Sequence, residues 1–215
     1  MMLVYDVIKF CFYPKPFVYG AAGRVSVADV EARADLIAGA AVFVTQLEQP
    51  IPAAKRGLEL ARAAGVATIL NPAPAAALGN DILALCDFIT PNETEAEALT
   101  GLPVGTLAEA RAAADALLAR GVGAVVITLG ANGALYHDAQ RSVHVPVISA
   151  GPVVETTGAG DAFNGGFAVA LSEGLDVADA VRFGCATAGI SVTRAGTAPS
   201  MPSRAEIDTL LAAQI

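Results

Sequence analysis

The chain has 215 residues, a length that fits one domain or slightly more. Its 13 Lys and Arg residues against 21 Asp and Glu residues give a net charge of -8, which argues against the clustered basic charge that a nucleic-acid partner requires. Hydrophobic residues make up 54% and charged residues 16%, so the composition excludes disorder. Residues 121–137, a long stretch without Asp, Glu, Lys or Arg, contain four glycines, so no membrane-spanning helix is expected.

The three cysteines, Cys11, Cys86 and Cys185, lie far apart in the sequence. They match neither a zinc site nor a disulfide framework, which favours a reducing compartment. No charged segment precedes a clean apolar run at the start, so we expect no secretory signal and a cytoplasmic protein.

Residues 1–20 differ in composition from the rest of the chain. They hold six of the twelve aromatic residues and two of the three lysines, but neither alanine nor arginine. We hypothesise that this segment is a replaced or misread start that is joined to the body of the chain; an ordinary aromatic-rich edge strand is the alternative. The predicted division is an atypical segment over 1–20 and one domain over 21–215.

From Ser26 onward, short apolar runs alternate with segments of helical spacing. Ser26, Thr106 and Ser203 can cap helices, while Gly65 and Gly101 can end them. In chain order we predict helix 26–38, strand 40–46, helix 50–64, strand 66–70, a break at 71–74, strand 87–90, helices 92–100 and 106–120, strand 124–129, a turn at 130–133, strands 134–137 and 143–147, helices 158–172 and 177–193, and a last helix from residue 204. This alternation indicates βαβ units, and therefore an α/β fold with a mainly parallel sheet.

The run Glu155–Phe167, with the sequence ETTGAGDAFNGGF, carries the clearest chemical signal. Gly158, Ala159 and Gly160 expose backbone N–H groups where a helix begins, and such a terminus binds anions, including phosphate. Asp161 follows in the first turn, where a carboxylate can accept a proton from an attacking hydroxyl. Donors and base together fit phosphoryl transfer. The alternative is a tight strand-to-helix turn whose glycines serve packing.

This run closely resembles the C-terminal signature of the ribokinase, or PfkB, family of carbohydrate kinases. Further segments resemble the family's motifs in the family's order, and the resemblance extends from about Arg24 to the C-terminus. These segments are Gln46–Glu48, Asn71–Pro74, Thr90–Glu95, Thr128–Gly133 and Ser191–Ser200.

The resemblance implies a three-layer, Rossmann-like fold and a set of roles for individual residues. Asp161 would be the catalytic base, with Gly158, Ala159 and Gly160 as the anion hole, and Glu48 and Asp161 would contact the sugar. ATP would contact Asn92, Thr128, Leu129, Gly130, Ala131, Asn132, Gly133, Gly160, Asp161 and Cys185. Mg²⁺ would lie near Glu95, held through water, and K⁺ near Glu155, Thr157, Ser191, Arg194, Gly196 and Ser200, because hard cations prefer oxygen ligands.

Several of these residues also have plain structural interpretations. Glu48 can simply end a strand at the surface, Asn92 can be an N-cap, and Glu95 can be a solvated helix residue. Residues 130–133 can form an ordinary hairpin turn. Cys185 can be a small buried apolar residue.

The sequence departs from the family pattern in two places. Glu155 stands where the family usually has Asp, which affects the expected cation site. The family's N-terminal portion, with its first strands, β lid and sugar site, has no counterpart, so we expect an N-terminally truncated fold. Uncovered apolar surface would then favour self-association or a homodimer, unless residues 1–20 cover it.

The expected function is ATP-dependent phosphorylation of a sugar hydroxyl, with D-ribose as the favoured acceptor because of the segments 71–74 and 92–97. The expected partners are the small-molecule sugar and ATP, with neither nucleic acid nor membrane. Two alternatives remain: another sugar or nucleoside kinase of the same family, and a catalytically inactive nucleotide-binding remnant.

Overall fold

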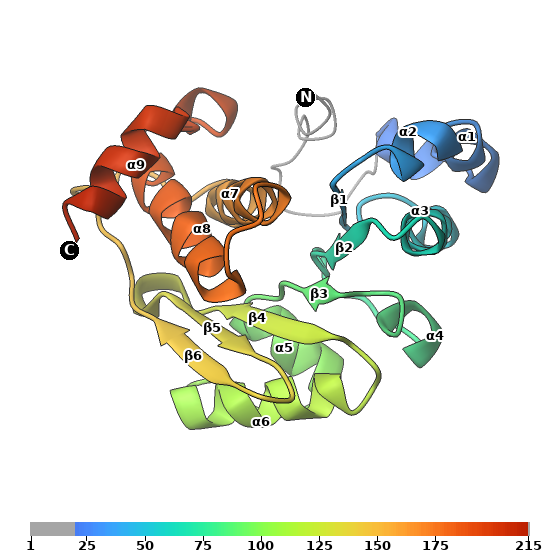
Figure 1. Cartoon of the computed structure of the whole chain (residues 1–215). Helices are drawn as coiled ribbons and strands as arrows, with labels where there is room; N and C mark the ends of the chain where they lie inside the picture. The colour runs from blue at the N-terminus through green and yellow to red at the C-terminus, as the bar shows by residue number, and fades with distance from the viewer. Residues whose placement is uncertain (1–19, 215) are drawn as a thin grey trace. The chain divides into compact units, whose positions relative to one another are not determined.

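The computed structural model describes residues 20–214 (Figure 1). These residues form two compact units. The sheet unit comprises residues 20–129 and 135–144, and the helical unit comprises residues 130–134 and 145–214. The atypical segment predicted over 1–20 lies outside the described residues except for Gly20, so that hypothesis and the domain boundary stay predictions. No helix within residues 20–214 is long and apolar enough to cross a membrane.

The strands form one sheet whose spatial order follows the chain (Figure 1). In that order they are β1 (Val42–Thr45), β2 (Ala67–Leu70), β3 (Phe88–Ile89), β4 (Ala124–Thr128), β5 (Ala134–His137) and β6 (Ser142–Val145). The pairs β1–β2, β2–β3 and β3–β4 are parallel. In β4, residues Ala124–Ile127 are all buried, as expected for a parallel strand that is covered on both faces. The predicted α/β class with a mainly parallel sheet is therefore confirmed.

The helices of the sheet unit are α1 (Val27–Glu31), α2 (Ala34–Ala38), α3 (Ile51–Ala63), α4 (Asn80–Leu83), α5 (Glu93–Thr100) and α6 (Leu107–Leu118), with a 3₁₀ turn, η1 (Ala22–Arg24), before them. Helices α3, α5 and α6 begin and end close to the predicted positions. The capping box at Ser26 is present, and Gly65 and Gly101 have the positive φ values of 73° and 72° that favour glycine.

Three details differ from the sequence prediction. The single helix expected over 26–38 is split into α1 and α2, with Arg33 outside helical geometry at φ -118°. The short helix α4 was not predicted, since it starts at Gly79 without a side-chain cap. At α6, Glu109 accepts the N–H of Gly105 and not that of Thr106, so the expected capping box is only half formed.

The core of the sheet unit lies between the strands and the helices α3 and α6. Helix α3 packs on β1 and β2, and α6 packs on β4. Fully buried side chains from these elements include Leu58, Leu70, Ile89, Leu117 and Val125. Burial of a side chain of this size contributes roughly 1.5–3 kcal/mol relative to exposure, so this cluster holds the strand ends in place.

The helical unit is built around α7 (Ala159–Ser172) and α8 (Val177–Ser191), followed by η3 (Ala198–Ser200) and α9 (Arg204–Ala212). Helices α7 and α8 approach closely at glycines. A Cβ on Gly166 would lie 2.3 Å from Thr187 Oγ1, and one on Gly184 would lie 2.9 Å from the ring of Phe163. The predicted capping box at Ser203 is present at the start of α9.

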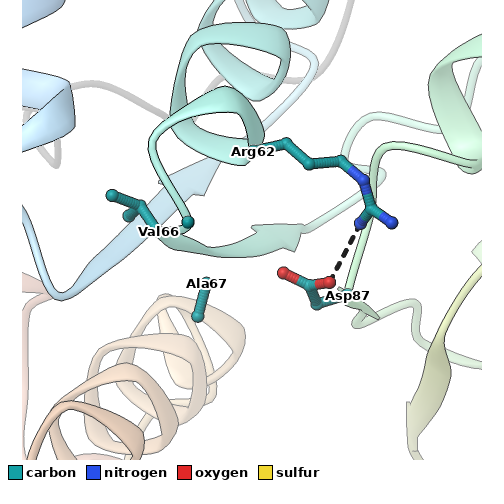
Figure 2. A pocket seen from close by; sticks show the side chains of 5 residues that line it. Arg62, Val66, Ala67 and Asp87 are labelled. Atoms are coloured by element: carbon teal, nitrogen blue, oxygen red, sulfur yellow. Dashed lines mark hydrogen bonds and ion pairs between the residues drawn. The ribbon is translucent and has the colours of Figure 1, made fainter.

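A buried polar network ties β2 to β3 near their amino ends. Thr68, fully buried, donates to the carbonyl of Leu85 (2.8 Å) and accepts the N–H of Asp87 (2.8 Å). Asp87 in turn accepts from the N–H of Thr68 (2.9 Å) and from Arg62 (3.0 Å). A shallow pocket lies here, and Figure 2 shows the Arg62–Asp87 ion pair at its side. Because the carboxylate of Asp87 is already hydrogen-bonded within the chain, we assign this end of the sheet a structural role.

Replacing Thr68 by Val should lower the free energy of unfolding by about 1–3 kcal/mol, because the Leu85 carbonyl and the Asp87 N–H would lose a buried partner. Chemical denaturation measures this change. The same replacement at the exposed Thr209, whose hydroxyl bonds only within α9, should change stability by no more than about 0.5 kcal/mol. Equal losses at the two positions would contradict the role given to the Thr68 network.

Candidate functional site

The carboxyl ends of the parallel strands carry a row of polar side chains in the sheet unit. Gln46 follows β1, Asn71 follows β2, and Thr90 follows β3. Gln46 Nε2 donates to Asn71 Oδ1 (3.2 Å), and Asn71 Nδ2 donates to the carbonyl of Thr90 (2.8 Å). In parallel α/β sheets, ligands bind beyond this edge, so the row stands where a substrate site is expected. Half-buried Glu48 lies on the loop after β1.

Asn92 and Glu95, the predicted nucleotide and magnesium contacts, form the capping box of α5. Asn92 Oδ1 accepts the N–H of Glu95 (2.8 Å), while Glu95 Oε2 accepts the N–H of Asn92 (2.9 Å). Burial raises the pKa of the Glu95 carboxyl, and the bond from the Asn92 N–H lowers it by less. The structural interpretation of Asn92 as an N-cap is thus confirmed. Glu95 is buried and not a solvated helix residue.

The end of β4 adjoins this cap. Thr128 N–H donates to the carbonyl of Pro91 (2.9 Å), and Asn92 and Thr128 form an isolated parallel bridge. The structure therefore brings together Asn92 and Thr128, which were predicted to contact the nucleotide, and Glu95, which was predicted to hold Mg²⁺ through water.

Residues 130–133 form a tighter element than a simple turn. Gly130–Asn132 is a 3₁₀ helix, η2. Gly133 follows at φ 87°, where a Cβ would lie 2.0 Å from the carbonyl oxygen of Val145. The backbone can pass this close only because the residue is glycine.

In the helical unit, α7 begins at Gly158, which has φ 80° and ψ 4° and no side chain with which to cap the helix. Ala159 N–H donates to the carbonyl of Thr156 (3.1 Å), so this amide is used by the turn itself. Gly160 is exposed, and a Cβ added there would meet nothing within 4 Å. Asp161 is half-buried in the first turn. The helix thus presents a glycine-rich, positively polarised terminus next to a carboxylate.

Glu155 links the segment before α7 to the loop after α8 by hydrogen bonds. Its Oε2 accepts the N–H of Gly196 (2.7 Å), although the two residues are 41 positions apart. The N–H groups of Val154 and Glu155 also donate to the carbonyl of Val192 (2.8 and 3.1 Å). The bond from Gly196 and a second from Thr157 hold the pKa of the Glu155 carboxyl below its ordinary value. These contacts bring Glu155, Thr157 and Gly196, three of the predicted cation residues, into one cluster.

The remaining residues predicted for K⁺ are Ser191 at the end of α8, Arg194 on the loop that follows and Ser200 in η3, and they are partly engaged. Ser191 Oγ donates to the carbonyl of Ala188 (2.9 Å), and Ser200 Oγ donates to that of Thr197 (2.6 Å). Both hydroxyls keep oxygen lone pairs for a cation. The Arg194 side chain is ion-paired to Glu206 on α9, so it offers its backbone carbonyl and not its side chain to such a site. Within residues 20–214, no three His, Cys, Asp or Glu residues gather in a metal-binding group.

The Glu155 contact predicts a pH-dependent contribution to stability. Because the pKa of the folded state is lowered, the contribution is present above the ordinary value of 4.5 and is lost as the pH falls through the folded pKa. We expect Glu155→Gln to lower the melting temperature at neutral pH, with a difference that shrinks below about pH 4.5. Thermal unfolding between neutral and acidic pH measures it, and a difference independent of pH would refute the carboxylate's role.

Cys185 is buried in α8, and burial raises the pKa of its thiol to about 12. It therefore stays protonated at neutral pH, as a small apolar residue would. This agrees with the structural interpretation of Cys185. Its predicted contact with the nucleotide stays a prediction.

Sequence reasoning missed two residues that the structure connects to the site. Asn71 was noted only as part of a motif, yet its side chain bridges the ends of three strands. Thr197 lies against Gly158, since a Cβ on Gly158 would be 3.2 Å from Thr197 Cγ2. The only available signal for Asn71 was an amide residue directly after a buried apolar run, and Thr197 was noted only as part of the Ser191–Ser200 motif.

The parallel sheet and the polar groups at its carboxyl ends define an α/β protein of the class that binds ligands beyond the strand ends. The model of the pfkB family carbohydrate kinases matches residues 21–204. The chain belongs to this family, which confirms the resemblance on which the residue roles were predicted.

Individual relatives agree with this assignment. The chain is 40% identical over 194 residues to the ribokinase of Staphylococcus aureus (strain COL), covering 89% of this chain and 64% of the relative. It is 38% identical over 187 residues to the deoxyribokinase of Salmonella typhi, covering 86% and 61%. The structure of Arabidopsis thaliana ribokinase complexed with ribose and ATP superposes with a TM-score of 0.81 at 32% identity, covering 84% of this chain and 59% of that one. The chain thus spans about three fifths of the length of these relatives.

Proposed function

We propose that the chain carries the nucleotide-binding and catalytic part, residues 21–215, of an ATP-dependent sugar kinase that converts D-ribose to D-ribose 5-phosphate. The observation that carries this proposal is the start of α7, where the helix N-terminus has no side-chain cap and Asp161 places a carboxylate in the first turn. Identity of 40% to a ribokinase supports ribose as the acceptor. We place the protein in the cytoplasm, as its cysteine usage favours.

In this proposal each group at the terminus of α7 has one task. Asp161 takes the proton of the sugar hydroxyl as the hydroxyl oxygen bonds to phosphorus. The amides of Gly158 and Gly160 at the start of α7 bind the phosphoryl oxygens and stabilise their charge, while the amide of Ala159 stays bonded to the carbonyl of Thr156. ATP supplies the transferred phosphoryl group when bound, and we assign Asn92, Thr128 and residues 129–133 to it. Asn92 Oδ1 is occupied in the cap of α5, so the Nδ2 donors are the part of its side chain suited to a phosphate.

The oxygen groups fit the two proposed cations to different degrees. For K⁺, the ionised Glu155, the hydroxyls of Thr157, Ser191 and Ser200 and the carbonyls of 194 and 196 form an all-oxygen set, which suits a hard cation. For Mg²⁺, Glu95 is buried, and its raised pKa opposes ionisation. A contact through water therefore fits Glu95 better than direct ligation. Mg²⁺ usually keeps several of its waters and is otherwise bound by one or two carboxylates and by the phosphates of the substrate.

The test is ADP release from ATP with Mg²⁺ and K⁺, measured with D-ribose, with 2-deoxy-D-ribose and without sugar. We expect release that depends on ribose. Preference for deoxyribose would favour the activity named for the Salmonella relative, and thus another kinase of the family. Nucleotide binding without sugar-dependent release would overturn the proposal in favour of an inactive nucleotide-binding protein. Light scattering on the same sample tests the proposed self-association.

A further inference from the structure

The side chain of Asn71 has both of its hydrogen-bonding ends in use at the edge of the sheet where the substrates are proposed to bind. The residue is 8% exposed. Its Oδ1 accepts from Gln46, at the end of β1, and its Nδ2 donates to the carbonyl of Thr90, at the end of β3. One amide therefore spans from the strand on one side of β2 to the strand on the other.

These two bonds begin where the backbone ladder stops. The last ladder bonds at this edge run from Asn71 N–H to the carbonyl of Thr45 and from Thr90 N–H to the carbonyl of Leu70 (2.9 Å each). Beyond them the strands turn into loops. The Asn71 side chain thus adds a side-chain link between these segments just past the regular strand pairing.

The two linked segments carry different predicted roles. Gln46 lies on the loop that carries Glu48, the residue assigned to the sugar, and its carbonyl accepts from Gln49 Nε2 (2.8 Å). Thr90 lies two residues before Asn92, which is assigned to the nucleotide. The backbone bond from Leu47 N–H to the carbonyl of Ala73 (2.9 Å) holds the first loop independently, so the side-chain link is not needed to keep that loop on the sheet.

We propose that Asn71 is a positioning residue that aligns the sugar loop, residues 46–49, with the nucleotide loop, residues 90–92. This inference rests on the proposed kinase function. Its physical basis is that a loop already held in its binding position costs less to order when its ligand binds, so releasing one loop lowers the affinity for the ligand that this loop contacts. Neither end of the Asn71 amide needs to touch a substrate for this.

The chemistry of the amide allows its two ends to be separated. Asn71→Asp keeps an acceptor for Gln46 but removes the donor to the Thr90 carbonyl. Gln46→Leu removes the donor to Asn71 and leaves the bond to Thr90 intact. Thr68→Val is the control, because it removes buried hydrogen bonds to Leu85 and Asp87 near the amino end of the same strand, β2, and none to either loop.

The experiment measures, by calorimetry, the affinities for D-ribose and for a non-hydrolysable ATP analogue in each variant, together with the melting temperature. We expect Asn71→Asp to lower the affinity for the ATP analogue by about three- to tenfold and to leave the affinity for ribose nearly unchanged. Gln46→Leu should lower the affinity for ribose by about the same factor and leave the affinity for the analogue nearly unchanged. Thr68→Val should lower the melting temperature and leave both affinities unchanged.

The two proposals fail in different ways. Absence of ribose-dependent ADP release in the unmodified chain would count against the kinase function, while analogue binding would still test the nucleotide end of Asn71. Unchanged affinities in both Asn71→Asp and Gln46→Leu would overturn the positioning role. The positioning role would also be overturned if both affinities fell equally and in step with the melting temperature, because that is the result expected of a purely structural residue. If Asn71→Asp does not fold, Gln46→Leu alone decides the question through ribose affinity.

Discussion

Replacing Asp161 by Asn is expected to lower the rate of ribose-dependent ADP release by about 10²–10⁴-fold, because the amide cannot take the proton of the sugar hydroxyl. The change preserves the shape of the side chain at its half-buried place in the first turn of α7. Loss of negative charge near the helix N-terminus should cost only about 0.3–1 kcal/mol of stability. Affinity for a non-hydrolysable ATP analogue should change little.

Asp179→Asn is the matched control, since Asp179 occupies the first turn of the neighbouring helix α8 and loses the same charge. It should have a similar effect on stability and none on turnover. Steady-state kinetics and thermal unfolding of both variants separate the catalytic effect from the electrostatic effect on the helix. If Asp161→Asn keeps most of its turnover, Asp161 is not the base, and the proposed mechanism is wrong.

Replacing Gly158 by Ala is expected to impair both stability and turnover. At φ 80° an L side chain costs about 1–2 kcal/mol, and the new Cβ would lie 3.2 Å from Thr197 Cγ2. Relief of this contact requires movement of the turn that starts α7. A displacement of about 1 Å of the amides that hold the phosphoryl group should slow turnover by about 10²-fold.

Gly174→Ala provides the control for backbone strain alone. Gly174 has φ 79°, and a Cβ there would meet nothing within 4 Å. This variant should lose about the same 1–2 kcal/mol from strain and retain full turnover in its folded fraction. Denaturation curves and initial rates check both variants. Full turnover in folded Gly158→Ala would show that the start of α7 does not position the reacting phosphoryl group.

Local interactions made much of this fold predictable from the sequence. The helix starts at Ser26, Asn92 and Ser203 were predicted and are present, because each cap bonds to groups only three residues away. The helix ends at Gly65 and Gly101 follow from the same short range, since a positive φ at one residue stops the helix there. The break between α1 and α2 was not predictable in this way, because no proline or glycine marks it.

The candidate site was predictable only in part. The order of its motifs identified the family, and the family supplied roles for Asp161 and Asn92. The connections that hold these residues in place were not predictable. Asn71 and Thr90 are 19 positions apart, and Glu155 and Gly196 are 41 positions apart.

The α/β class, the positions of most helices and strands, and the glycine-rich start of α7 were therefore predictable from the amino-acid pattern alone. Each of these depends on periodicity or on contacts within a few residues. Three features became visible only in the folded chain: Asn71 links three strand ends, Glu155 is bonded to Gly196, and Glu95 is buried with a raised pKa. Burial and long-range hydrogen bonds arise when distant segments pack together, so the periodicity of the sequence does not indicate which side chains will become partners.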